Sequence, residues 1–142
     1  MVTRYHGIDI PRVETAIRAA ERGTSAELRV AISRFYFWGD VRRAAESAFK
    51  RLHMEHTRAR DGVLLFVAPR LRRFAIVADV GAAAQVEPVF WEDVARGLGA
   101  RFRAGDPTGG LERALATIGA RLAEPFPPDP ADRNELPDRV VV

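Results

Sequence analysis

Two apolar runs joined by a four-residue turn constrain the fold of this chain more than any other feature. Val63–Ala68 and Arg73–Ala78 have the length and apolar content of strands that are buried on both faces of a sheet. The link between them, residues 69–72, is too short for a helical crossover. The second strand is therefore expected to return antiparallel beside the first.

The length of this turn also determines which residues face one another. If Pro69 lies opposite Arg72, pairing continues along the hairpin until Gly62 meets Asp79. Asp61 and Asp79 are then neighbours at the open end of the hairpin. Two carboxylates that meet at one strand end are the sharpest chemical feature of the sequence.

The periodicity of the flanking segments predicts an α/β fold. Residues 25–33 begin with the alternation of a strand, while Asp9 and Asp40 are suited to cap helices. A strand, a helix and a buried strand in that order form a right-handed crossover, so residues 25–33 should run parallel to Val63–Ala68. Two further helices are expected after the hairpin, with apolar stripes over residues 91–102 and 111–122. The sequence thus predicts a mixed sheet, a parallel crossover unit plus the antiparallel hairpin, covered on both faces.

Composition divides the chain into a body and a tail. Its 142 residues, 47% of them hydrophobic, suffice for one domain with its own core. Five of the nine prolines lie between Pro125 and Pro137. We therefore assign residues 1–124 to the α/β domain and residues 125–142 to a proline-rich C-terminal tail, whose last three valines are suited to add to a sheet edge.

The residue types exclude several classes of function. The chain has no cysteine, which excludes disulfides, thiolate metal sites and a cysteine nucleophile. It has no apolar run of the ~20 residues that span a bilayer and no signal-peptide core. A cytoplasmic location without membrane insertion is the expectation. The net charge is only +3 and the arginines are scattered, so nucleic acid is not an expected partner.

The parallel pairing adds a third acid to the two aspartates. Glu27 and the preceding Thr24 and Ser25 should lie at the same end of the sheet as Asp61 and Asp79. Carboxylates and hydroxyls are the ligands that Ca²⁺ and Mg²⁺ prefer, and such a cation can activate water against a phosphorylated small molecule. We expect Asp61, Asp79 and Glu27 to bind the cation. Glu27 is also a candidate general base, and Thr24 and Ser25 would orient substrate.

An ordinary structural interpretation of these residues remains open. Asp61 precedes a glycine, as turn residues often do, and Asp79 is suited to cap the following turn. Glu27 is placed to pair with Arg29 or Arg73 across the sheet. In this interpretation the acids serve the fold and bind no metal.

Three other groups of residues suggest different functions. His53 and His56, with Glu55 between them, have the donor types of a transition-metal site, provided that the helix continues far enough to keep them on one face. The consecutive aromatic residues Phe35, Tyr36, Phe37 and Trp38 suggest a surface for a protein partner or self-association, the basis of a non-catalytic alternative. Asp40 and nearby arginines form an unspecific phosphate site at the opposite end of the sheet. Residues 105–110 are better suited to helix capping than to anion binding.

Several short motifs are distinctive in combination: Thr-Ser-Ala-Glu-Leu-Arg-Val at 24–30, Arg-Asp-Gly-Val-Leu-Leu-Phe-Val-Ala-Pro at 60–69, Arg-Phe-Ala-Ile-Val at 73–77 with Gly81 following, Phe90-Trp91, and Phe102 to Asp106 before Gly110. Together they resemble the TPM domain family, whose members include a thylakoid-lumen phosphatase-like protein, a photosystem-repair protein and a receptor regulator. The proline-rich tail is similar to that of a short bacterial branch.

This resemblance implies a three-layer α/β/α Rossmann-like sandwich and divalent-cation binding, with acid phosphatase or nucleotide-hydrolysing activity in some members. It also implies a role in membrane-complex assembly or repair, in which the domain acts as an interaction module. The family's site loops correspond to Arg60-Asp61 and to residues 79–81. Arg60 departs from the pattern, since a polar or acidic residue is frequent there, and it places a cation beside the proposed site. The transmembrane helix and glycine-rich tail of many relatives have no counterpart, so membrane attachment is not expected.

Overall fold

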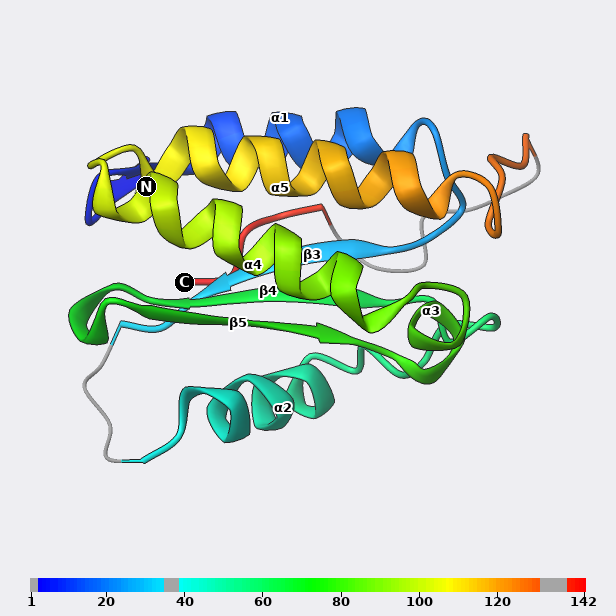
Figure 1. Cartoon of the computed structure of the whole chain (residues 1–142), viewed down its shortest axis with the longest axis horizontal. Coiled ribbons are helices and arrows are strands. Elements are labelled where there is room, and N and C mark those ends of the chain that lie inside the picture. Colours follow the sequence, from blue (N-terminus) through cyan, green and yellow to red (C-terminus); the bar gives the residue numbers. More distant parts are fainter. Residues whose placement is uncertain (1–2, 35–38, 131–137) are drawn as a thin grey trace.

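A three-stranded mixed sheet forms the centre of the molecule (Figure 1). The structure is a computed structural model and describes residues 3–34, 39–130 and 138–142. The strands β3 (Leu28–Ile32), β4 (Val63–Ala68) and β5 (Arg73–Ala78) lie in the order β3-β4-β5. β3 pairs parallel to β4, and β4 pairs antiparallel to β5. The predicted crossover unit and hairpin are therefore confirmed.

The register of the hairpin is also the predicted one. Ala68 faces Arg73 at the turn, and Val63 faces Ala78 at the open end. The turn η1 (Pro69–Leu71) is a single 3₁₀ turn that ends at Arg72, whose φ of 52° is left-handed. Pro69 begins this turn because its fixed φ suits a first helical position.

The two strands of the hairpin differ in burial, which the sequence did not predict. Every residue of β4 is buried, as expected for a central strand covered on both faces. β5 is instead an edge strand in which only Ala75 and Val77 are buried. The expectation that β5 is buried on both faces was wrong, because an apolar run alone does not distinguish a central strand from a covered edge strand.

Three helices cover one face of the sheet: α1 (Ile10–Glu21), α4 (Pro88–Arg103) and α5 (Pro107–Leu122) (Figure 1). Their apolar stripes meet alternate side chains of β3 and β4, and the largest fully buried side chains of this layer are Ile8, Ile17, Leu28, Leu65, Leu111, Leu115, Ile118 and Leu122. Burial of each such side chain contributes about 1.5 to 3 kcal/mol. Asp9 caps α1 by accepting a hydrogen bond from Arg12 N–H.

The opposite face is covered by α2 (Val41–Arg51), which begins at its cap Asp40. Ala45, Ala48 and Phe49 of α2 pack on Leu64 and Phe66 of β4. The short helix α3 (Val80–Ala84) follows β5 and is capped by Asp79. Helices on both faces of the sheet make the fold the expected three-layer α/β/α sandwich.

A small hairpin at the start of the chain was not predicted. β1 (Arg4–Tyr5) and β2 (Ile8–Asp9) pair antiparallel around a two-residue turn. Both turn residues are left-handed, with φ of 50° at His6 and 81° at Gly7. Such turns match the twist of two short strands.

The described parts of the tail pack against the body. Ser25 N–H donates to the Phe126 carbonyl at 2.9 Å, next to the end of α5. Val141 forms a parallel bridge with Ala31, donating to the Val30 carbonyl and accepting from Ile32 N–H. The predicted addition of the terminal valines to a sheet edge is therefore confirmed, at the outer edge of β3.

Candidate functional site

The start of the parallel strands brings the three predicted acids to one edge of the sheet. Val63 N–H donates to the Glu27 carbonyl at 2.8 Å, and Asp79 N–H donates to the Gly62 carbonyl at 2.9 Å. Glu27, Asp61 and Asp79 are all buried, with exposed fractions of 2%, 3% and 6%. The fold thus holds three carboxylates beside the same strand ends, a costly arrangement unless each finds partners.

Asp79 is bound by Arg60 and by its own helix. Its two carboxylate oxygens accept from Arg60 Nε at 2.6 Å and Nη2 at 2.8 Å, a bidentate ion pair. Val80 N–H also donates to Asp79, so the side chain caps α3. The hydrogen bonds that Arg60 donates to Asp79 raise the pKa of its guanidinium, and the charge of Glu55 contributes to this shift. The arginine that departs from the family pattern therefore neutralises one of the predicted ligands.

This ion pair leads to a stability prediction. Arg60→Gln should lower Tm by a few degrees, because the buried Asp79 carboxylate loses its charged partner and keeps only the capping hydrogen bond from Val80. The Arg60 side chain is 48% exposed, and access of water limits the loss. The control is Arg58→Gln, at an exposed position two residues earlier. Equal Tm values for the two variants in a thermal melt would contradict this interpretation of the pair.

Thr24 and Ser25, the predicted substrate-orienting residues, contact the end of α5. The Thr24 hydroxyl lies 2.5 Å from the Phe126 carbonyl and 3.2 Å from the Leu122 carbonyl, and it accepts from Ala26 N–H. These bonds give Thr24 a structural role in joining the chain before β3 to the tail. Ser25 is only half buried and lines a cavity of about 520 Å³ that also contains Asp61.

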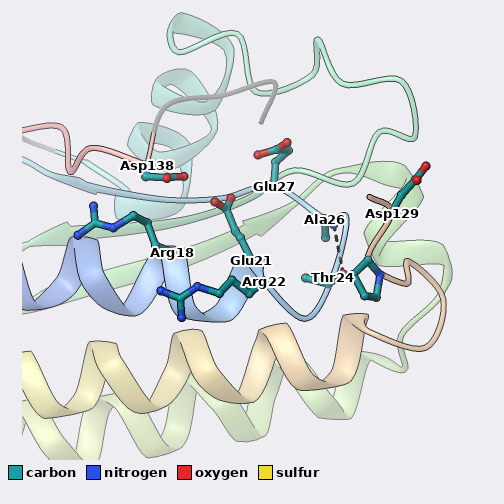
Figure 2. A pocket seen from close by; sticks show the side chains of 9 residues that line it. Arg18, Glu21, Arg22, Thr24, Ala26, Glu27, Asp129 and Asp138 are labelled. Atoms are coloured by element: carbon teal, nitrogen blue, oxygen red, sulfur yellow. Dashed lines mark hydrogen bonds between the residues drawn. The ribbon is translucent and has the colours of Figure 1, made fainter. Parts of the chain in front are cut away.

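Glu27 lines a different cavity, of about 380 Å³, on the α1 side of the same edge (Figure 2). Its lining residues are Arg18, Glu21, Arg22, Thr24, Ala26, Glu27, Pro128, Asp129 and Asp138. Figure 2 shows the carboxylates of Glu21, Glu27 and Asp138 on one side of the cavity, while the side chains of Arg18 in α1 and of its C-cap residue Arg22 point away from them. Pro128 and Asp129 of the tail line both this cavity and the one that contains Asp61. The two cavities therefore adjoin at this segment of the tail.

Glu21 and Asp138 were not found by sequence reasoning, yet both line this cavity and a side-chain hydrogen bond joins them. Burial raises the pKa of Glu21 from its ordinary 4.5 to about 10, and a side-chain hydrogen bond to Asp138 adds to the shift. The Glu21 carboxyl also accepts a hydrogen bond from Leu28 N–H at 2.9 Å. At neutral pH Glu21 is therefore protonated and shares its proton with Asp138.

The other candidate sites named from the sequence differ in what the structure shows. In the described ranges, the acids and histidines whose ligand atoms all lie within 4.8 Å of one another are His53, Glu55 and His56, and the three strand-edge acids do not form such a group. Asp106 caps α5 by accepting from Gly109 N–H, so the loop at 105–110 serves capping as expected. Asp40 caps α2. The aromatic run at 35–38 lies outside the described residues.

The fold and this edge define the class of the molecule: an α/β/α sandwich with a mixed sheet and buried carboxylates where its parallel strands begin. The family model of the TPM domain matches residues 9–121, and the chain belongs to this family. Among solved structures, it is similar to the NMR structure of the BA42 protein from the psychrophilic bacterium Bizionia argentinensis. The two are 32% identical, with a TM-score of 0.86 over 93% of this chain and 90% of that one. No curated protein matches the chain.

The predicted family and fold are thus confirmed. None of the helices in the described ranges is both long and apolar enough to cross a membrane.

Proposed function

We propose that this TPM domain binds a divalent cation, Ca²⁺ or Mg²⁺, at the strand-start edge and hydrolyses phosphate esters there with low activity. The observation that carries the proposal is a cavity whose lining includes both carboxylates and arginines (Figure 2). A cation site for phosphate chemistry needs both types of group, because acids bind the metal and guanidinium groups bind the phosphate. Membership of the TPM family supports the same function.

Carboxylate oxygens, the donor type that a hard cation prefers, are present at this edge. Glu27 and Asp61 are buried carboxylates that line the two adjoining cavities, and Asp129 lines both of them. We propose that Glu27 and Asp61 hold the cation and that Asp129 is a further ligand. Asp79, the third predicted ligand, would act mainly by holding Arg60 in place, since both of its oxygens accept hydrogen bonds from Arg60.

The remaining residues have distinct roles in this proposal. Arg18, in the last turn of α1, and Arg22, its C-cap residue, would bind the phosphate oxygens of the substrate, since both line the cavity. Glu27 would accept a proton from the attacking water. The bound cation would supply charge neutralisation and polarise that water. Thr24 and Ser25 would position the loop before β3 through their bonds to Phe126.

Calorimetric titration of the metal-stripped chain with Ca²⁺ and then Mg²⁺ tests the cation site. We expect one equivalent to bind, and Asp61→Asn or Glu27→Gln to weaken binding by about tenfold or more, because each removes a charged ligand. Asp93→Asn is the matched control, since Asp93 lies exposed on α4 and pairs only with Arg96 among the described contacts. Absence of binding to the wild type, or unchanged binding in both site variants, would contradict the proposal.

Hydrolysis of p-nitrophenyl phosphate tests the enzymatic part separately. We expect turnover that requires the cation and that falls in Arg18→Gln and Arg22→Gln, whereas both variants still bind the metal. Cation binding without turnover above the Asp61→Asn background would contradict the proposed phosphohydrolase activity and leave only the proposed metal-binding function.

A further inference from the structure

We propose a second metal centre in this protein, formed by His53, Glu55 and His56 and selective for a transition metal of the Zn²⁺ class. One ligand atom from each of the three side chains lies within 4.8 Å of the others. The group lies in the turn between α2 and β4. It uses none of the residues to which we assign oxygen ligands above.

The backbone of this turn brings the two imidazole rings together. α2 ends at Arg51, and His53 takes a left-handed φ of 57°, which is uncommon for a side chain of this size. His56 N–H then donates to the His53 carbonyl at 3.0 Å and closes the turn. The rings stack with centroids 4.9 Å apart and planes inclined by 30°. Two histidines three positions apart therefore share one surface although the helix has ended before them.

The residue between the first histidine and the glutamate fixes the turn to the core. Met54 is fully buried and belongs to the apolar cluster between α2 and the sheet. Its N–H donates to the Phe49 carbonyl at 3.0 Å. His53 and His56 are exposed on either side of it. A fixed backbone with exposed donor side chains lets the rings rotate toward an ion without loss of core packing.

One carboxylate oxygen of Glu55 is buried without a hydrogen-bond partner and is suited to bind a cation. Its Oε1 lies 3.5 Å from His56 Nε2. Its Oε2 is shielded from solvent and makes no hydrogen bond to the described chain. A buried carboxylate oxygen without a partner is costly, and a metal ion would compensate it. The side chain as a whole is 31% exposed, so the ion can reach it from solvent.

The donor types select the metal. Two imidazole nitrogens and one carboxylate oxygen are the protein ligands of one type of four-coordinate Zn²⁺ site, in which water takes the fourth position. Ca²⁺ and Mg²⁺ prefer oxygen ligands alone and therefore bind weakly to a site with two nitrogen ligands. The two metal centres should therefore be separable by the choice of cation.

The test is calorimetric titration of untagged full-length protein with Zn²⁺ in the presence of excess Mg²⁺, with Co²⁺ absorption as a report on nitrogen ligation. The chain has three histidines, and the third, His6, provides a matched control. His6 and His53 are both exposed and both left-handed, with φ of 50° and 57°. His53→Asn and His6→Asn thus make the same change in the same backbone conformation, and asparagine tolerates that conformation.

We expect one equivalent of Zn²⁺ to bind to the wild type and to His6→Asn. His53→Asn, His56→Asn and Glu55→Gln should each weaken binding by about tenfold or more. Asp61→Asn should leave Zn²⁺ binding unchanged, which separates this centre from the strand-edge site. Equal Zn²⁺ affinity in His53→Asn and His6→Asn, or no stoichiometric binding to the wild type, would overturn the proposal.

Discussion

Replacing Gly81 by alanine is expected to lower Tm by roughly 10 °C. A Cβ at this position would lie 2.0 Å from the Ala59 carbonyl oxygen and 2.6 Å from that of Arg60. The Arg60 carbonyl accepts hydrogen bonds from Gly81 N–H at 2.8 Å and Ala82 N–H at 3.2 Å, so the two backbones must stay this close. Because both obstacles are main-chain atoms, the clash has no cheap side-chain solution, and we expect a loss of about 3 kcal/mol.

The matched control for this substitution is Gly97→Ala. Gly97 lies within α4, and a Cβ there would meet no atom within 4 Å. Alanine in an open helical position stabilises by about 0.5 to 1 kcal/mol, so this variant should melt slightly above the wild type. A thermal melt that gives the same shift for Gly81→Ala and Gly97→Ala would show that the loop at 59–60 does not need to lie against α3.

Glu21→Gln is expected to make the protein more stable than the wild type at alkaline pH. Native Glu21 keeps its proton up to a pKa of about 10, whereas the unfolded chain releases it near 4.5. Its contribution to stability is therefore complete below pH 4.5 and is lost as the pH rises toward 10. Glutamine reproduces the protonated form, because its amide can donate to Asp138 while its carbonyl accepts from Leu28 N–H. The Glu21→Gln variant should therefore not lose this contribution to stability as the pH rises.

The measurement is Tm from pH 5 to pH 9 for both proteins. The difference in Tm between Glu21→Gln and the wild type should grow with pH. Because both proteins share all other titrating groups, the contribution of those groups cancels in this difference. Glu92→Gln deletes the same charge at an exposed position of α4 and should give a difference that changes little. Parallel curves for Glu21→Gln and the wild type would contradict a shared proton between Glu21 and Asp138.

The central hairpin could be predicted from the sequence because its turn allows few solutions. Four residues between two apolar runs permit only an antiparallel return, and pairing outward from Pro69 leads to Gly62 opposite Asp79. The convergence of Glu27, Asp61 and Asp79 at one edge follows from that register and from the parallel pairing of β3 with β4. Local chain geometry was sufficient for this part of the site.

The rest of the site depends on contacts between distant segments. Glu21 lies in the last turn of α1 and Asp138 in the tail, and no local pattern connects them. Arg60, which forms the bidentate pair with Asp79, likewise has a left-handed φ of 52° that the sequence does not indicate. For the histidines, the sequence linked proximity to a continuous helix, whereas a turn brings the rings together instead. Tertiary packing therefore decides which acids acquire partners.

Each edge strand of the sheet, β3 and β5, has backbone groups that are hydrogen-bonded by another part of the chain. Val141 takes up backbone groups of Val30 and Ile32 along the outer side of β3. On the far side, Arg42 of α2 donates from Nη1 to the Ile76 carbonyl of β5 at 2.5 Å. Open sheet edges act as templates for intermolecular pairing, and a terminal strand or an arginine laid across them blocks that route. Val141 and Arg42 thus occupy backbone groups at both edges of the sheet that would otherwise be open to a strand of another molecule.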